Sequence, residues 1–119
     1  MIPVYKWKWQ GHPGHFISAN KCMFRMSTVV GKYLISTIGE YYPNLGNTRG
    51  EEVVREPIGY DGQYYETYIF TVGESEMECG CAQVSDWCEI DGKRTSTAKE
   101  ANLTHMEMCY KYAMMQEDL

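Results

Sequence analysis

The 119-residue sequence has no long apolar run and no secretion signal. A membrane-spanning helix needs about 20 consecutive apolar residues, and no stretch of the chain approaches this length. Residues 1–7 also lack the apolar segment and the small-residue cleavage site of a signal peptide. We therefore expect a cytoplasmic protein that does not bind membranes, in which the five cysteines are reduced thiols or metal ligands.

The sequence also lacks the common motifs that fix a reaction. It contains no P-loop, no dinucleotide-binding fingerprint, no zincin helix and no calcium-binding loop. His12 and His15 lie near Cys22 in the sequence, but nucleophilic catalysis also requires an orienting group and an oxyanion hole, for which we find no pattern. We therefore predict no catalytic residue and no cofactor.

The cysteines offer one alternative, a metal site. Cys79, Cys81 and Cys88 could bind zinc together with His105 or Cys109. Their C-x-C-x6-C spacing is not the pair of C-x2-C knuckles that is typical of zinc sites. Isolated buried thiols explain these residues better, and we predict no metal.

Acidic residues are nearly absent from the first 50 positions. Six lysines and arginines stand against a single glutamate there, a balance of +5, whereas the rest of the chain carries −10. The total of −5 opposes binding to long duplex nucleic acid, which is a polyanion. Such a distribution is typical of a protein with one anion-binding half, although the two halves can also neutralise each other across the fold.

What the sequence does contain is a strong strand signal in residues 31–43. Both alternating sets of side chains are largely apolar, which indicates a central strand buried on both faces. Alternation also predicts strands over residues 2–10, 22–30 and 64–72. The strand over 22–30 lies only a few residues before the central strand, which predicts a hairpin between them.

The segments between these strands are less regular. Residues 42–63 hold many glycines and prolines, which predicts an irregular segment with one possible helical turn at 51–55. Residues 82–90 are a short, partly apolar stretch, and Asp91-Gly92 after it suits a tight turn.

Residues 97–116 give the one clear helix. Thr97 and Glu100 match a capping box at its start. One side of the helix carries a stripe that should pack on the sheet, made of Ala98, Ala101, His105, Cys109, Tyr112 and Gln116. Within this stripe we interpret His105 as a hydrogen-bonded core residue. The opposite side carries Lys99, Glu100, Glu107 and Lys111. We predict a single α+β domain over residues 1–119, with an antiparallel sheet of four or five strands and one C-terminal helix packed on one face.

Aromatic and basic side chains alternate in the first half of the chain. Nucleobases stack on aromatic rings, and phosphates accept hydrogen bonds from lysine and arginine. A simpler interpretation is that these aromatics fill the core. From this pattern we predict a ligand-binding site made of Lys8, Trp9, Arg25, Tyr42 and Arg49.

Several segments resemble a group of small proteins encoded by phages and prophages, which have no assigned activity. The resemblance is carried by Gly11-x-x-Gly14-His15-Phe16-Ile17, Gly31-x-Tyr33-x-Ile35-Ser36-Thr37-x-Gly39-Glu40-Tyr41 and His105-Met106-x-x-Cys109-x-x-Tyr112-Ala113. It spans about residues 9–113 and transfers no functional residue. It implies a small protein that binds and blocks host or defence components.

Three functions follow as hypotheses. The first is a phage-type, non-enzymatic protein that sequesters a small nucleotide-like anion, such as a host defence signal. The second is an inhibitor that binds a host or defence protein through its acidic half, centred on residues 74–78. The third is a small enzyme that uses His12 or His15. A homodimer through the edge strand at residues 4–9 is also possible.

Overall fold

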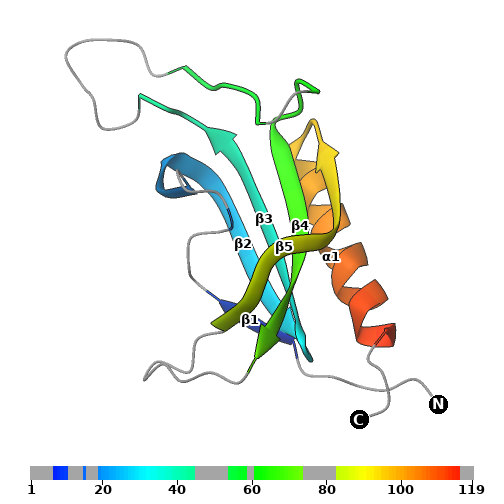
Figure 1. Cartoon of the computed structure of the whole chain (residues 1–119). Helices are drawn as coiled ribbons and strands as arrows, with labels where there is room; N and C mark the ends of the chain where they lie inside the picture. The colour runs from blue at the N-terminus through cyan, green and yellow to red at the C-terminus, as the bar shows by residue number, and fades with distance from the viewer. Residues whose placement is uncertain are drawn as a thin grey trace.

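The computed structural model describes residues 7–10, 15, 19–44, 54–58, 61–73 and 83–115. They form one antiparallel sheet whose five strands are ordered as in the sequence. The strands are β1 (Trp7–Gln10), β2 (Cys22–Val30), β3 (Tyr33–Tyr41), β4 (Tyr65–Gly73) and β5 (Gln83–Thr95), and the helices are the short η1 (Ala19–Lys21) and the long α1 (Ala98–Met114). Helix α1 lies along one face of the sheet (Figure 1). The predicted fold class is confirmed.

Strand β3 is the centre of the sheet, as its two apolar faces predict. Residues 33–39 are all buried: α1 covers one face of the sheet, and the side chain of His15 contacts Ser36 on the other. The predicted hairpin is also present, since Val30 of β2 pairs with Tyr33 of β3 across the two-residue turn of Gly31 and Lys32.

The main core lies between α1 and the sheet. Buried residues of β2, β3 and β4 contact the buried stripe of α1 in one cluster, which comprises Val30, Tyr33, Ile35, Ile69, Cys109, Tyr112 and Ala113. The rings of Tyr33 and Tyr112 meet edge to face at 4.8 Å. Burial of an apolar side chain of this size stabilises a fold by about 1.5–3 kcal/mol, so this cluster fixes α1 on the sheet.

Helix α1 begins at the predicted position. Thr97 is the N-cap, and its hydroxyl accepts a hydrogen bond from the backbone N–H of Glu100 at 3.1 Å. The Glu100 carboxylate accepts a hydrogen bond from the Thr97 hydroxyl at 3.0 Å. In a full capping box this carboxylate would instead accept from the backbone N–H of Thr97. No helix of the described residues is long and apolar enough to cross a membrane.

A polar network is buried inside this core around His105. Its Nε2 lies 2.8 Å from the Thr28 hydroxyl and its Nδ1 lies 2.7 Å from the Thr37 hydroxyl, which also bonds Thr67 at 2.7 Å. Both ring nitrogens therefore have a partner, as the interpretation of a core histidine requires. Burial lowers the pKa of His105 to about 4, so the ring is neutral at pH 7.

One prediction of local structure was wrong. Asp91-Gly92 is not a turn, because β5 continues through it to Thr95, with Asp91 opposite Ile69 and Gly92 opposite Tyr68. Of the predicted helical turn at 51–55, the described residues 54 and 55 form no helix, and Glu56 after them forms a β-bridge to Tyr41. Residues 51–53 lie outside the described part of the chain. At Asp91-Gly92 tertiary pairing overrode the local preference.

Candidate functional site

Strand β5 has a large bulge in its pairing with β4. Ile69 pairs with Asp91 and Thr71 pairs with Asp86, so one residue of β4, Phe70, faces four residues of β5, 87–90. A simple bulge has one extra residue, and this one has three. The bulge bends β5 across the sheet (Figure 1) and carries Cys88, Glu89 and Ile90 to the surface. Bulges of this kind often lie beside binding sites, because they turn side chains away from the regular pleat.

A hollow of about 350 Å³ lies beside the bulge. We call it the β5 hollow; it is lined by Asp61, Tyr68 and residues 89–94. Its charged side chains are three carboxylates, those of Asp61, Glu89 and Asp91, and two cations, Lys93 and Arg94. Its volume is at the lower end of the range for small-molecule sites, which begins at about 300 Å³.

The Tyr68 ring forms the inner wall of this hollow. It lies over Gly92, where a Cβ atom would come within 2.4 Å of Tyr68 Cδ1. The His15 ring stacks on Tyr68, with 4.8 Å between centroids and 28° between planes. Only glycine at position 92 leaves room for this arrangement, so the β4–β5 pairing itself places the ring.

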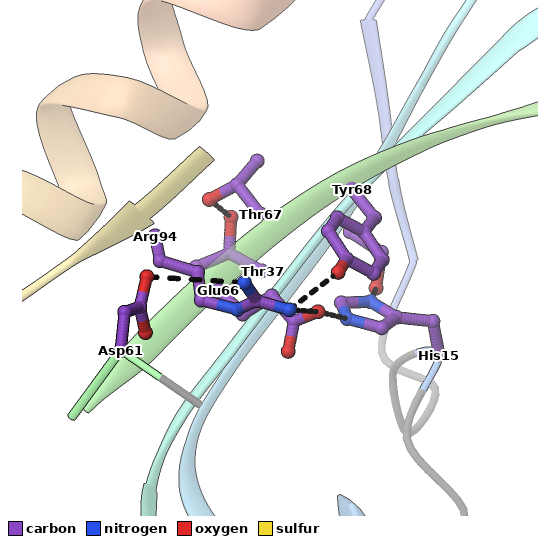
Figure 2. Close-up of polar contacts among 8 residues, drawn as sticks. His15, Thr37, Asp61, Glu66, Thr67, Tyr68 and Arg94 are labelled. Carbon is purple, nitrogen blue, oxygen red and sulfur yellow. Dashed lines mark hydrogen bonds and ion pairs between the residues drawn. The ribbon is translucent and has the colours of Figure 1, made fainter. Parts of the chain in front are cut away.

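A chain of polar contacts continues from this ring along the face opposite α1 (Figure 2). His15 Nδ1 lies 3.1 Å from the Ser36 hydroxyl, and His15 Nε2 lies 3.8 Å from Glu66 Oε1. Arg94 Nη2 donates to the Tyr68 hydroxyl at 2.9 Å and lies 3.7 Å from Glu66 Oε1. Arg94 Nη1 lies 3.8 Å from Asp61 Oδ2. We call these six residues the open-face cluster.

The charges in this cluster influence one another. Burial opposes ionisation of Glu66, but the neighbouring side chains of His15, Tyr68 and Arg94 outweigh it, so the pKa of Glu66 lies below its usual value. Burial, together with the Glu66 carboxylate, raises the pKa of Tyr68 to about 12. At pH 7 the cluster therefore holds an ionised Glu66 and a neutral Tyr68.

Two buried nitrogens of the cluster have no hydrogen-bond partner among the described residues. They are Arg94 Nε and His15 Nε2. The ion-pair contacts of both side chains with Glu66 and Asp61, at 3.7–3.8 Å, are longer than hydrogen bonds. A buried donor without an acceptor costs about 1–3 kcal/mol, so an additional acceptor at this place would stabilise the cluster.

Ser36, His15 and Glu66 have the composition of a hydrolytic triad. Ser36, however, is only 1% exposed, so its hydroxyl cannot reach a substrate in this conformation. His12, the other histidine of the enzyme hypothesis, lies outside the described residues. In this conformation Ser36 is therefore not an accessible nucleophile.

The predicted ligand-binding residues are spread along β2. Lys8 and Trp9 belong to β1, opposite Val29 and Thr28, and Arg25 is exposed on β2. Half-buried Tyr42 binds the Lys21 carbonyl through its backbone N–H, at the other end of the strand. At about 3.3 Å per residue, the ends of this row are roughly 25 Å apart. Arg49 lies outside the described residues. Their role as one site stays a prediction.

The alternative zinc site is not assembled by the residues that the structure describes. Cys79 and Cys81 lie outside them, and Cys88 is exposed on β5. His105 engages both nitrogens with threonine hydroxyls, and Cys109 is buried in the core. No cluster of three metal-binding side chains occurs within the described ranges.

Comparisons with protein-family models, curated proteins and solved structures gave no match, so function is argued from the site. The resemblance to phage proteins therefore stays a prediction. The site residues that the sequence did not reveal are Asp61, Tyr68, Glu89, Lys93 and Arg94. They belong to the acidic half of the chain. The opposite charges of Glu66 and Arg94 point to this site only when the β4–β5 register, which pairs these two residues, is already known.

Proposed function

We propose that this is a non-enzymatic binding protein that holds one small, nucleotide-like ligand in the β5 hollow. The observation that carries this proposal is the hollow that the β5 bulge opens beside Tyr68, with cations and carboxylates around one aromatic ring. Lys93 and Arg94 can donate hydrogen bonds to a phosphate. The sequence predicted the same aromatic and basic chemistry, but in the first half of the chain. Asp61 and Glu89 can accept from the N–H groups of a base or from ribose hydroxyls.

The charge of the hollow limits the ligand. Three carboxylates against two cations leave a balance of −1, and Arg94 already has Glu66 and Asp61 as neighbours. A triphosphate or a nucleic acid strand would meet a repulsive rim. A ligand with a single phosphate group and several N–H or O–H donors fits better. This chemistry describes a nucleoside monophosphate or a cyclic mononucleotide.

Isothermal titration calorimetry of the full chain with a panel of nucleotides tests the proposal. The panel contains nucleoside 5′-monophosphates, 3′,5′-cyclic mononucleotides, cyclic dinucleotides and nucleoside triphosphates. We expect one site per chain for a monophosphate or a cyclic mononucleotide, with weaker binding of triphosphates. Lys93→Ala should lower the affinity about tenfold, which corresponds to the loss of one charge-assisted contact.

A matched control comes from Arg25→Ala. Arg25 is an exposed cation on β2, away from the hollow and part of the site predicted from the sequence. If Arg25→Ala weakens binding and Lys93→Ala does not, the ligand binds at the earlier predicted site and the β5 hollow is wrong. Absence of binding across the whole panel contradicts a nucleotide-like ligand altogether.

The phage-type context completes this proposal. A protein of that kind acts in the cytoplasm of the host, where a cyclic nucleotide that it sequesters would be a defence signal. The inhibitor hypothesis remains the second proposal, although its residues 74–78 lie outside the described ranges. It differs experimentally, because an inhibitor with an acidic surface requires a protein partner and loses affinity with added salt.

A further inference from the structure

Helix α1 has a second apolar stripe on the side that faces away from the sheet. Leu103, Met106, Tyr110 and Met114 are 52%, 38%, 64% and 53% exposed. At about 100° per residue their spacing of three, four and four places them in one row. The buried stripe of α1 lies on nearly the opposite side of the helix. We call this row the outer stripe.

An outer stripe of this kind requires an explanation. Single exposed apolar residues are normal, but a continuous row on one helix usually marks a contact surface. A helix that is apolar on both sides is typically covered on both sides. In the described structure α1 packs on β2, β3, β4 and β5 through its buried stripe, and the helix lies along one face of the sheet (Figure 1).

We infer that the outer stripe is the contact surface of a homodimer in which two α1 helices pack antiparallel. A two-fold pair brings the same surface of each chain together. The stripe has its midpoint near residue 108–109, so Leu103 of one chain lies opposite Met114 of the partner subunit. Met106 lies opposite Tyr110 of the partner subunit in the same way. Both contacts are apolar against apolar.

Charge complementarity supports this occupant and this direction. Glu107 and Lys111 lie on the same flank of the outer stripe, and their midpoint is residue 109, which nearly coincides with that of the stripe. An antiparallel two-fold pair places each flank against the same flank of the partner. Each Glu107 then faces Lys111 of the partner subunit, twice per dimer. A parallel pair would place these charges against the other flank, which carries the uncharged Asn102.

The existing contact of Lys111 is compatible with this arrangement. Its Nζ donates to Asp91 Oδ2 at 2.7 Å, and an ammonium group has two further donors. Asp91 thus holds the lysine in position on the flank. The dimer surface is also separate from the β5 hollow, because the hollow is formed by β4, β5 and Asp61 and the outer stripe belongs to α1.

Sedimentation velocity of the full chain over a wide range of concentration tests the inference. We expect a reversible monomer–dimer equilibrium in the wild-type protein. Leu103→Glu should abolish the dimer, since it places a charge against Met114 of the partner subunit at both ends of the stripe contact. Glu107→Lys and Lys111→Glu should each weaken the dimer about tenfold, because each places like charges opposite one another twice.

The decisive sample is the double variant Glu107→Lys/Lys111→Glu, in which the charges are exchanged. The antiparallel register predicts that it recovers most of the wild-type dimer affinity. Glu56→Lys is the matched control: it makes the same charge change at an exposed residue outside α1 and should leave the dimer unchanged.

Three outcomes overturn the inference. One is a wild-type protein that stays monomeric at every concentration, which would leave the stripe to a different protein. Another is a dimer that persists in Leu103→Glu, as a dimer through the β1 edge would. The third is a double variant as weak as the single ones, which contradicts the antiparallel register. Circular dichroism of each variant confirms that α1 is still formed.

Discussion

The ring of Tyr68 lies so close to Gly92 that a Cβ atom at position 92 would be 2.4 Å from the ring atom Cδ1. The neighbouring ladder repeats this relationship, since a Cβ atom at Gly39 would be 2.1 Å from Cδ1 of Tyr65. In each pair the glycine faces the tyrosine directly across two antiparallel strands. The two pairs differ in burial, because Gly39 is buried and Gly92 is exposed.

This difference predicts two outcomes for the same substitution. Gly92→Ala should move Tyr68 out of the wall of the β5 hollow and lower ligand affinity about tenfold. It should cost only about 1 kcal/mol of stability, because the ring can turn toward solvent. Calorimetric titration with the nucleotide found for the wild-type protein, together with urea denaturation, measures both effects.

Gly39→Ala is the control for that substitution. The Tyr65 ring has no free space to enter, so we expect a loss of about 2 kcal/mol in the free energy of unfolding. Ligand affinity of the folded fraction should not change, since Gly39 is not part of the hollow. Equal losses of affinity in the two variants would show that Tyr68 does not form the binding wall.

The buried position of His105 predicts a dependence of stability on pH. Its pKa is about 4 in the folded protein and about 6.5 in the unfolded chain. Between these values the unfolded chain binds a proton that the native state does not, so the free energy of unfolding decreases as pH falls from 6.5 to 4. The full effect is about 3 kcal/mol. His105→Gln should be less stable at pH 7, and urea denaturation at several pH values should show a smaller change for it.

Asp91 predicts a pH dependence in a lower range. Lys111 Nζ donates to Asp91 Oδ2 at 2.7 Å, and the Tyr112 hydroxyl donates to the same oxygen at 2.8 Å. These bonds hold the pKa of Asp91 below its usual value despite partial burial. This stabilisation is present above the unfolded pKa of about 3.9 and is lost as pH falls through the folded pKa. Asp91→Asn should therefore reduce stability by about 1 kcal/mol at pH 7, and the difference from wild type should diminish below pH 4.

Asp61→Asn is the matched control for this substitution, because the exposed Asp61 carboxylate reaches Arg94 only at 3.8 Å. We expect a change of less than about 0.5 kcal/mol, as is usual for exposed ion pairs. Thermal denaturation of the three proteins between pH 3 and pH 7 makes the comparison. If both variants lose the same free energy of unfolding, the bonds from Asp91 on β5 to α1 stabilise the fold no more than an exposed ion pair does.

Ser36→Ala tests the enzyme hypothesis. Because Ser36 is buried and its hydroxyl bonds His15 at 3.1 Å, we expect a loss of about 1 kcal/mol in stability and no effect on any reaction. Assays with nitrophenyl ester and nitrophenyl phosphate substrates measure hydrolysis directly. Turnover by the wild-type protein that disappears in both Ser36→Ala and His15→Ala would favour a small enzyme over a binding protein.

Local patterns predicted the parts of the fold that depend on near neighbours. The two apolar faces of residues 33–39 indicate the central strand, and the stripe of Ala101, His105, Cys109 and Tyr112 indicates the side of α1 that packs on it. The same reasoning missed the extension of β5, because Asp91-Gly92 has the composition of a turn. The binding residues that it predicts in the basic half do not line the β5 hollow, and their role stays a prediction.

The sequence by itself determined the fold class, the central strand, the start of the helix and the side of the helix that enters the core. These features follow from the period of the apolar residues and from a capping residue, which act over a few positions. Only the tertiary structure decided the β5 bulge and the hollow beside it. Their position depends on the pairing of Ile69 with Asp91 and of Thr71 with Asp86, and on the bonds from Asp91 to α1. Such contacts join segments that are distant in the sequence, and no local period encodes them.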